Sequence, residues 1–154
     1  MPQTGLQLVE AIRDGTTTTP TSPWALHMNV HKENQIIEVA YGRALTHWHP
    51  GKQFSVPDGY VQGGLINALA DAGQALALIT THEEFVPWVT TDLQTRFIRP
   101  IKIGTAVHIE NIVRSKTKTT AIVESTFTID GEKLAAIITG GWRDSQGRRP
   151  ITVK

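Results

Sequence analysis

The segment from Gly59 to Thr81 constrains the fold of this 154-residue chain more than any other part, because it contains a single charged residue, Asp71. Residues 62–80 are rich in alanine and leucine and predict one long helix. A surface helix of that length normally carries several lysine or glutamate side chains on its outer side. We therefore expect this helix to be covered on most sides, by a sheet and by a second subunit or a loop.

Two faces are expected on this helix. Asn67, Asp71 and Gln74 stand at i, i+4 and i+7 and predict a narrow polar stripe. A carboxylate among apolar neighbours is unfavourable unless it is paired, protonated or used in catalysis. Asp71 therefore belongs either to a solvated helix side or to a general acid or base. The apolar residues expected on the opposite face are Leu65, Leu69, Ala72, Leu76 and Ile79.

Four strands are expected after the helix, in keeping with a content of valine, isoleucine and threonine that reaches 46 of the 154 residues. Asp130-Gly131 is a strong hairpin signal between the last two strands. The four segments are 89–99, 106–114, 120–129 and 133–143. In the first of them, the residues expected to share one side are Val89, Thr91, Leu93, Thr95 and Phe97.

The part of the chain before the long helix predicts shorter elements. Residues 4–14 have the apolar spacing of a short amphipathic helix. Segments 24–31 and 35–43 predict two strands joined by a turn, and residues 45–59 predict a loop. Antiparallel strands with one long apolar helix favour an α+β domain in which the helix packs on one face of the sheet.

Composition and charge exclude several classes of function for this chain. A net charge of +1 gives no electrostatic case for binding nucleic acid or an anionic membrane. The chain has no cysteine, which excludes disulfides, thiolate zinc sites and cysteine nucleophiles. No signal pattern and no apolar run of membrane-spanning length occurs, so we expect a cytoplasmic protein. The length predicts one domain over residues 1–154, with an N-terminal helix and connector in 1–23.

The glycines at the start of the long helix are the second candidate for chemistry. Gly63 and Gly64 would leave backbone N–H groups accessible at the positive end of the helix dipole, where an oxyanion or a phosphate can bind; a tight turn is the alternative. Gly63 and Asp71 are eight residues apart, which on a helix is roughly 12 Å. One carbonyl group cannot contact both, so a catalytic role requires two copies of the helix in a homodimer.

The residues from Asp58 to Gly64, followed by Leu69-Ala70-Asp71, resemble the signature of hotdog-fold acyl-CoA thioesterases of the phenylacetate-pathway (PaaI) type. A second block, Val89 to Leu93 with Phe97 to Pro100, resembles the later strand of that family. The resemblance implies an antiparallel sheet wrapped around a long central helix, here with an extra N-terminal helix. It also implies a homodimer or homotetramer that hydrolyses acyl-CoA to a free acid and CoA, with no cofactor beyond the CoA of the substrate.

The resemblance assigns roles to individual residues. Asp71 matches the carboxylate that activates water or attacks the thioester, and Gly63 matches the residue whose N–H, from the partner subunit, polarises the carbonyl. Thr90 stands where some members have a water-positioning hydroxyl. Gln62 replaces the usual histidine and cannot titrate, and Val56 replaces a common asparagine or glutamine.

Further residues are expected near the substrate. Gly64 and Asn67 stand on the helix. Trp48 is expected in the preceding loop, and it belongs either to the core or an interface, like the other tryptophans, or to the lining of an acyl pocket. The phosphates of CoA require cations, for which the candidates are Arg99, Lys102, Lys116, Lys118, Arg148 and Arg149. His47 and His49 lack further ligands at a suitable spacing, so no metal site is expected.

Three other functions stay open at this point. Gln62 and Val56 favour a hotdog protein that binds acyl-CoA without hydrolysing it. His49-Pro50-Gly51 faintly resembles the histidine segment of hotdog dehydratases or hydratases, although its spacing of 22 residues to Asp71 is longer than in those enzymes. A purely structural role would predict no binding of CoA at all.

Overall fold

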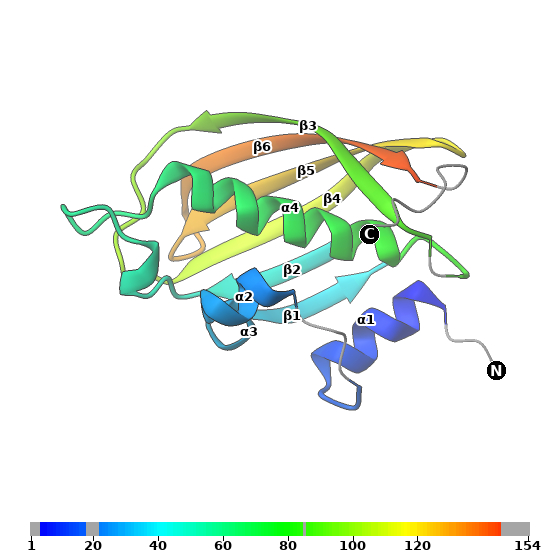
Figure 1. Ribbon diagram of the computed structural model, residues 1–154, viewed down its shortest axis with the longest axis horizontal. Helices are drawn as coiled ribbons and strands as arrows, with labels where there is room; N and C mark the ends of the chain where they lie inside the picture. The colour runs from blue at the N-terminus through cyan, green and yellow to red at the C-terminus, as the bar shows by residue number, and fades with distance from the viewer. Residues whose placement is uncertain (1–3, 18–21, 85, 146–154) are drawn as a thin grey trace, which may run out of the picture.

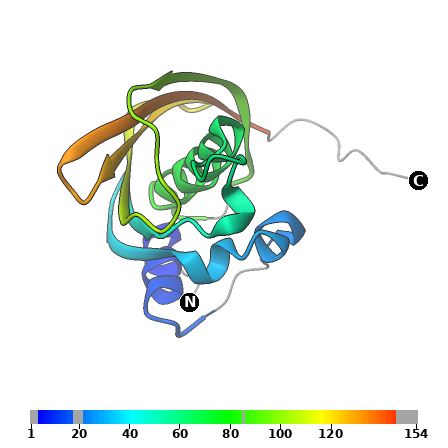
Figure 2. The ribbon, with the colours of Figure 1, turned by 90° about the vertical axis from the view of Figure 1, so that its left-hand side faces the viewer.

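The computed structural model describes residues 4–17, 22–84 and 86–145. Six antiparallel strands form one sheet in the order β1-β2-β4-β5-β6-β3, and helix α4 (Gly63–Ile79) crosses one face of it (Figure 1). Seen from the side, the sheet curls around α4 (Figure 2), which confirms the predicted α+β architecture. The strands are β1 (Asn34–Ala40), β2 (Arg43–Trp48), β3 (Trp88–Phe97), β4 (Val107–Lys116), β5 (Thr120–Ile129) and β6 (Lys133–Asp144).

The first hairpin uses a different partner strand from the one predicted: residues 35–40 of the predicted strand 35–43 form β1, but the strand that pairs with it follows it in the chain instead of preceding it. Residues 24–31 form no strand; they belong to two short helices, α2 (Pro23–His27) and α3 (Val30–Glu33). Pro23 opens α2 at a position where its missing N–H costs nothing. The predicted loop 45–59 begins as β2, and only its later part is irregular, around the 3₁₀ turn η1 (Lys52–Phe54). The hairpin is therefore β1–β2, with Gly42 in its turn at φ 71°.

Helix α1 (Gly5–Arg13) confirms the predicted N-terminal helix and packs against the end of α4. Its start is fixed by a reciprocal cap, in which the Gln7 N–H donates to Thr4 Oγ1 at 3.2 Å and the Thr4 N–H donates to Gln7 Oε1 at 3.0 Å. The Gly5 N–H also donates to the carbonyl of His82 at 2.8 Å. A side chain on Gly5 would overlap the Ile79 carbonyl, so glycine is what permits this close approach.

The buried face of α4 is rotated from the predicted one. Leu69 is buried as expected, but Leu65, Ala72, Leu76 and Ile79 are only half-buried. The residues that do face the sheet include small ones, and Gly73 packs directly against the Asn111 side chain of β4. Small residues let the helix axis approach the strands, which leaves the leucine side for other partners. The buried set is Ile66, Leu69, Ala70, Gly73, Gln74, Ala77 and Leu78.

A buried polar network fixes α4 on the sheet, and it removes Gln74 from the predicted polar stripe. The Gln74 Nε2 group donates to Ser125 Oγ at 3.0 Å and to the Ile138 carbonyl at 3.2 Å. Its Oε1 accepts from Trp142 Nε1 at 2.8 Å, and Ser125 Oγ donates onward to Asn111 Oδ1 at 2.7 Å. Because every partner is buried, this network specifies one position of the helix along the sheet.

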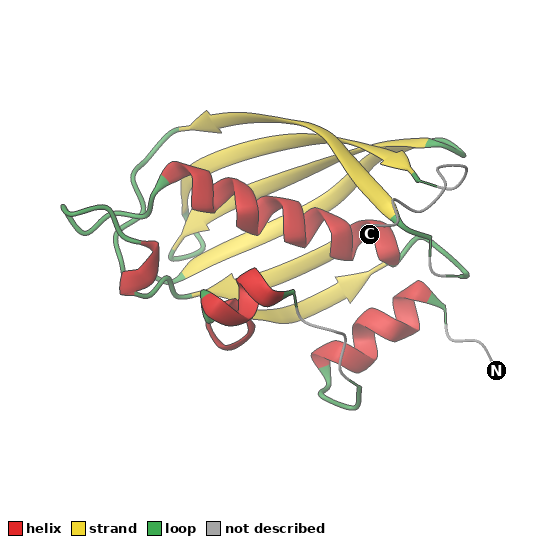
Figure 3. Ribbon diagram, in the orientation of Figure 1, coloured by secondary structure: helices red, strands yellow, loops and turns green. Residues whose placement is uncertain are grey.

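Strand β3 differs from the predicted alternation in its first half. The register with β6 shifts between Thr90 and Asp92, so the strand contains a bulge at Thr91. As a result Thr90, rather than Val89 or Thr91, points inward together with Leu93. β3 pairs only with β6 within the described chain, which makes it an edge strand of the sheet (Figure 3).

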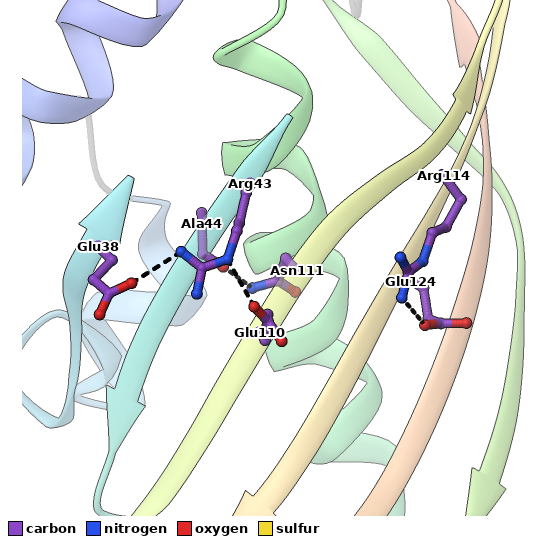
Figure 4. A network of polar contacts seen from close by, with 7 residues as sticks. All are labelled: Glu38, Arg43, Ala44, Glu110, Asn111, Arg114 and Glu124. Atoms are coloured by element: carbon purple, nitrogen blue, oxygen red, sulfur yellow. Dashed lines mark hydrogen bonds and ion pairs between the residues drawn. The ribbon is translucent and has the colours of Figure 1, made fainter. Parts of the chain in front are cut away.

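The turn between β5 and β6 follows the sequence signal. Asp130 and Gly131 both have positive φ, at 52° and 72°, as the two central residues of a type I′ turn do, and the Glu132 N–H donates to the Ile129 carbonyl at 3.0 Å across the turn. On the sheet face away from α4, charged side chains pair across strands. Arg43 lies between Glu38 and Glu110, and Arg114 pairs with Glu124 (Figure 4).

Candidate active site

Asp71 lies on the side of α4 that faces β3, half-buried between the helix and the strand. The hydroxyl of Thr90 donates a hydrogen bond of 2.5 Å to Asp71 Oδ1. Thr90 reaches the carboxylate only because the bulge turns it inward. The bond fixes the carboxylate rotamer and leaves the second oxygen, Oδ2, for another partner.

A second contact of the same kind lies along β3, closer to the N-terminus of α4. The hydroxyl of Thr95 donates to Asn67 Oδ1 at 2.6 Å. Asn67 and Asp71 are one helical turn apart, and both are held from the same strand. Two of the three residues of the predicted polar stripe, Asn67 and Asp71, therefore lie on one face of α4. Thr95 and Thr90 hold their side chains toward β3.

The amino terminus of α4 offers unpaired backbone donors. Gln62 is the N-cap residue and makes no side-chain capping bond. Among the described residues, no acceptor pairs with the N–H of Gly63 or of Gly64, whereas the next N–H, of Leu65, donates to the Gln62 carbonyl at 3.0 Å. Gly64 is exposed, and open space lies where its side chain would be. Two free amides at the positive end of the helix dipole can stabilise a negatively charged oxygen.

Phe97, the last residue of β3, covers Gly63. A Cβ atom on Gly63 would lie 3.0 Å from the edge of the Phe97 ring, so glycine permits this close packing. The ring is itself 54% exposed, which leaves it available to a ligand or a partner. Neither Phe97 nor Thr95 was singled out from the sequence as a site residue. Only the fold shows that the end of β3 lies against the start of α4.

Val56 and Arg99 lie on the segments that flank this region. Val56 is half-buried in a loop, where its N–H donates to the Tyr60 carbonyl at 2.8 Å. Arg99 is exposed after β3, and its Nη1 donates to the Leu134 carbonyl at 2.7 Å. Gln62 is exposed beside the free amides. Two of the cations proposed for phosphate, Arg148 and Arg149, lie outside the described residues.

The prediction that Trp48 lies in a loop and lines an acyl pocket is wrong. Trp48 is the last residue of β2 and is 0% exposed. Its ring packs edge-on against Phe54 and Phe127, at centroid distances of 5.1 and 6.5 Å. A side chain without accessible surface belongs to the core, and we remove Trp48 from the candidate site.

Three histidines cluster on the sheet face away from α4. His47 pairs across the strands with His108, at 4.8 Å between ring centroids, and His49 packs on His47 at 4.6 Å. Burial, and then the neighbouring His49 and His108, lower the pKa of His47 below its usual value. Within residues 4–17, 22–84 and 86–145, no three histidine or acidic side chains are placed to hold a metal ion. Over the same ranges, no helix is both long and apolar enough to cross a bilayer.

This cluster also bears on the dehydratase alternative. His49 contacts His47, whose side chain lies on the outer face of the sheet, whereas Asp71 lies on the inner side with α4. The two residues that a dehydratase would pair are thus separated by the sheet within one chain.

Comparisons with solved structures agree with this architecture. The PaaI protein of the phenylacetic acid degradation operon of E. coli superposes with a TM-score of 0.73 at 19% identity, over 91% of this chain and 92% of that one. A putative thioesterase related to phenylacetic acid degradation from Ralstonia eutropha gives 0.73 at 23% identity, over 88% and 98%. A Streptococcus mutans protein solved with bound acetyl CoA gives 0.69 at 19% identity, over 77% and 93%. At these identities the likeness shows the fold, which is the hotdog fold.

Sequence comparison supplies the family. No sequence among the curated proteins matches the chain. A family model, described as the thioesterase superfamily, matches residues 58–136, which is about half of the chain. The match begins at Asp58 and includes the start of α4, Asp71 and the whole of β3. On this match and on its hotdog fold, the chain belongs to the thioesterase superfamily.

Proposed function

We propose that this protein is an acyl-CoA thioesterase, which hydrolyses the thioester to a free acid and CoA. The observation that carries the proposal is the contact between Thr90 and Asp71, which orients a half-buried carboxylate on α4. Membership of the thioesterase superfamily supports the reaction class. The acetyl CoA bound to the Streptococcus mutans protein supports the choice of CoA as the thiol carrier.

In the proposed reaction, Asp71 acts as the base. Its free oxygen, Oδ2, removes a proton from water while the water oxygen attacks the carbonyl carbon of the thioester. The carbonyl oxygen becomes negatively charged and is stabilised by the N–H of Gly63. The C–S bond then breaks, and the sulfur of CoA leaves as a thiol after taking a proton from the Asp71 carboxyl group. Direct attack of Asp71 on the carbonyl carbon is the other route open to this carboxylate.

The Asp71 carboxylate and the Gly63 N–H that act on one thioester have to come from different subunits. They are eight residues apart on α4, which is roughly 12 Å along a helix axis. We propose a homodimer in which each Gly63 lies near the Asp71 of its partner, which gives two sites. The free edge of β3 supports a contact on this side, because an unpaired ten-residue strand is a template for pairing with a second copy. The exposed apolar side chains on and after β3 also support a subunit contact on this side; they are Val89, Phe97 and Ile98.

The remaining site residues are proposed to bind substrate. Asn67 would contact the acyl or thioester group, since Thr95 occupies only its Oδ1 atom. Gln62 and Gly64 border the free amides, with Val56 in the preceding loop, and the exposed Arg99 is a candidate for the phosphates of CoA. The proposed chemistry uses no metal and no cofactor other than the CoA of the substrate.

Release of free thiol from short, medium, long and aromatic acyl-CoAs tests the proposal. We expect turnover of at least one class, and a loss of about 100-fold or more in kcat for Asp71→Asn. Asp92→Asn is the matched control, because Asp92 is exposed on β3 and accepts its hydrogen bond from the neighbouring Thr91 rather than from Thr90. We expect Thr90→Val to lose about ten-fold and Thr90→Ser, which keeps the hydroxyl, to retain most activity. Unchanged turnover in Asp71→Asn would exclude the proposed mechanism.

A second candidate is a protein that holds acyl-CoA without hydrolysing it. Gln62 and Val56 favour it, because neither side chain can exchange a proton near the free amides. Calorimetry with an acyl-CoA, followed by analysis of the recovered ligand, separates the two functions. Binding with intact thioester supports the second candidate, whereas released CoA supports the enzyme.

A further inference from the structure

A pocket of about 420 Å³ lies on the side of α4 that faces away from Asp71. It is open to solvent on one side and bordered by α1, by the α2–α3 segment, by α4, and by β1 and β2, at the sheet edge opposite β3. Figure 1 shows these helices beside β1, with β3 on the other side of α4. We call it the N-terminal pocket, and its walls include Ala25, Val30, Ile36, Thr46, Ala72 and Leu76. Its size is in the range of small-molecule sites.

Two buried polar atoms in the wall of this pocket have no partner. Thr46 is 1% exposed and projects inward from β2, yet its Oγ1 makes no hydrogen bond with any described residue. The same holds for Oδ1 of Asn34, at the start of β1. Buried polar groups are nearly always satisfied, because leaving one unpaired is unfavourable. The third such atom within the described residues, Nε1 of Trp48, is not part of this wall.

The charges around the pocket indicate a neutral ligand. Of the described residues in its wall, Arg13 alone carries a permanent charge. Its guanidinium group is already paired with Asp14, at 2.8 and 3.2 Å. The exposed residues Ser22, His31 and Gln35 lie at the mouth, while the interior is aliphatic around Thr46. Among the described residues of the wall, an anion would therefore find no unpaired cation.

We propose that the N-terminal pocket binds a neutral, largely apolar small molecule that carries one hydroxyl or amide group. Oδ1 of Asn34 can only accept, so the ligand has to supply an O–H or N–H donor. The Thr46 hydroxyl can donate to, or accept from, a polar group of the ligand. The aliphatic walls then cover a ring or a short chain. This site is separate from the proposed catalytic site and does not depend on it.

Titration of the full chain with 3-phenylpropan-1-ol tests the proposal, followed by backbone amide NMR. The matched anion, 3-phenylpropanoate, has the same ring and chain but carries a charge. We expect saturable shifts at residues of the N-terminal pocket with the alcohol, and at least ten-fold weaker binding of the anion. The assay contains no acyl-CoA, so its result is independent of the proposed thioesterase activity.

Two variants make the test specific. Thr46→Val keeps the shape and removes the hydroxyl, so we expect about five-fold weaker binding of the alcohol, which corresponds to one hydrogen bond. We also expect its ligand-free Tm to rise by about 3 °C, because an unpaired buried group is removed. Thr126→Val, on the outer face of β5, is the control and should change neither value. Ala72→Met should abolish binding by filling the pocket.

The proposal fails on any of three results. The first is the absence of saturable shifts at the N-terminal pocket with the alcohol. The second is equal affinity of wild type and Thr46→Val for it. The third is a crystal structure from alcohol-soaked crystals in which only an ordered water satisfies Thr46 and Asn34.

Discussion

The Asp71 carboxylate on α4 is positioned by one hydroxyl group, that of Thr90 on β3. The Thr90 hydroxyl donates a hydrogen bond to Oδ1, and the other carboxylate oxygen, Oδ2, can accept a proton. Gly63 makes a different contribution, since it has no side chain to place and offers only its N–H. The absence of a Cβ also lets Phe97 pack over it. At this scale the proposed chemistry depends on one carboxylate oxygen and one backbone amide.

The role of the Gly63 amide can be tested without breaking the helix. Gly63 is the first residue of α4, where proline is well tolerated. Gly63→Pro removes the N–H, and we expect kcat to fall about 100-fold. Gly63→Ala is the control, because it meets the Phe97 ring with the same added Cβ but keeps the N–H. Equal loss in both variants, measured by thiol release, would assign the effect to packing rather than to the amide.

At the scale of elements, the position of α4 on the sheet decides where Asp71 lies. The network of Gln74, Ser125, Asn111 and Trp142 fixes the helix along the sheet, and Gly73 and Gly140 allow the close contact. A side chain on Gly140 would overlap the Gln74 amide. The bulge in β3 then selects Thr90 as the partner of Asp71. Four strands, β3 to β6, and one helix therefore set the geometry of a contact between two residues.

Removal of Gln74 should lower stability strongly. In Gln74→Leu the buried Trp142 Nε1 loses its acceptor, and we expect the free energy of unfolding to fall by roughly 2–4 kcal/mol. Gln94→Leu, at an exposed position of β3, should change it by less than about 0.5 kcal/mol. Denaturant unfolding measures both. Adding Trp142→Phe to Gln74→Leu should cost less than the sum of the single changes; strict additivity would argue against the coupled network.

The histidine cluster on the outer face predicts a pH effect. The pKa of His47 is lowered by burial and by His49 and His108. The unfolded chain therefore binds a proton at His47, near pH 6.5, before the folded protein does. It follows that stability is lost as the pH falls below about 6.5. NMR titration should give His47 a pKa below 6.5 that rises in His108→Gln; a value at or above 6.5 would contradict this assignment.

At the scale of the whole molecule, the proposed site is complete only in a dimer. One chain holds Gly63 and Asp71 on the same helix, two turns apart. The same chain leaves the β3 edge free and the leucine side of α4 half-buried. The β3 edge lies on the side of α4 that carries Asp71, whereas the N-terminal pocket, whose wall includes Ala72 and Leu76 of the leucine side, lies on the other side. The molecule thus has one side suited to a second copy and another closed by its own N-terminal helices.

Mixed dimers test this arrangement. Asp71→Asn and Gly63→Pro chains are each expected to be nearly inactive. If each site takes Gly63 from one chain and Asp71 from the other, half of the dimers in an equal mixture have one intact site. Activity should then return to about a quarter of wild type after refolding together. No recovery, with dimers confirmed by sedimentation, would place both groups in one chain.

Part of this protein is determined by local sequence. The extents of α1 and α4 and the Asp130-Gly131 turn were predicted to within one residue at each end of the helices, because neighbouring residues decide them. Five of the six strands, β1 and β3 to β6, overlap segments whose residue patterns predicted strands, whereas β2 lies mostly in the predicted loop 45–59. The isolated Asp71 also marked the candidate site from the sequence alone.

Tertiary structure decided the rest. Small residues and the Gln74 network rotated the buried face of α4, and a bulge chose Thr90 over Thr91. Trp48 is buried in the hydrophobic core instead of lining a pocket. Residues 24–31 lie in short helices instead of pairing as a strand. These outcomes depend on contacts between segments distant in sequence, whose packing free energy exceeds the local preferences of a few residues. Periodicity along one segment contains no information about the partner that segment will meet.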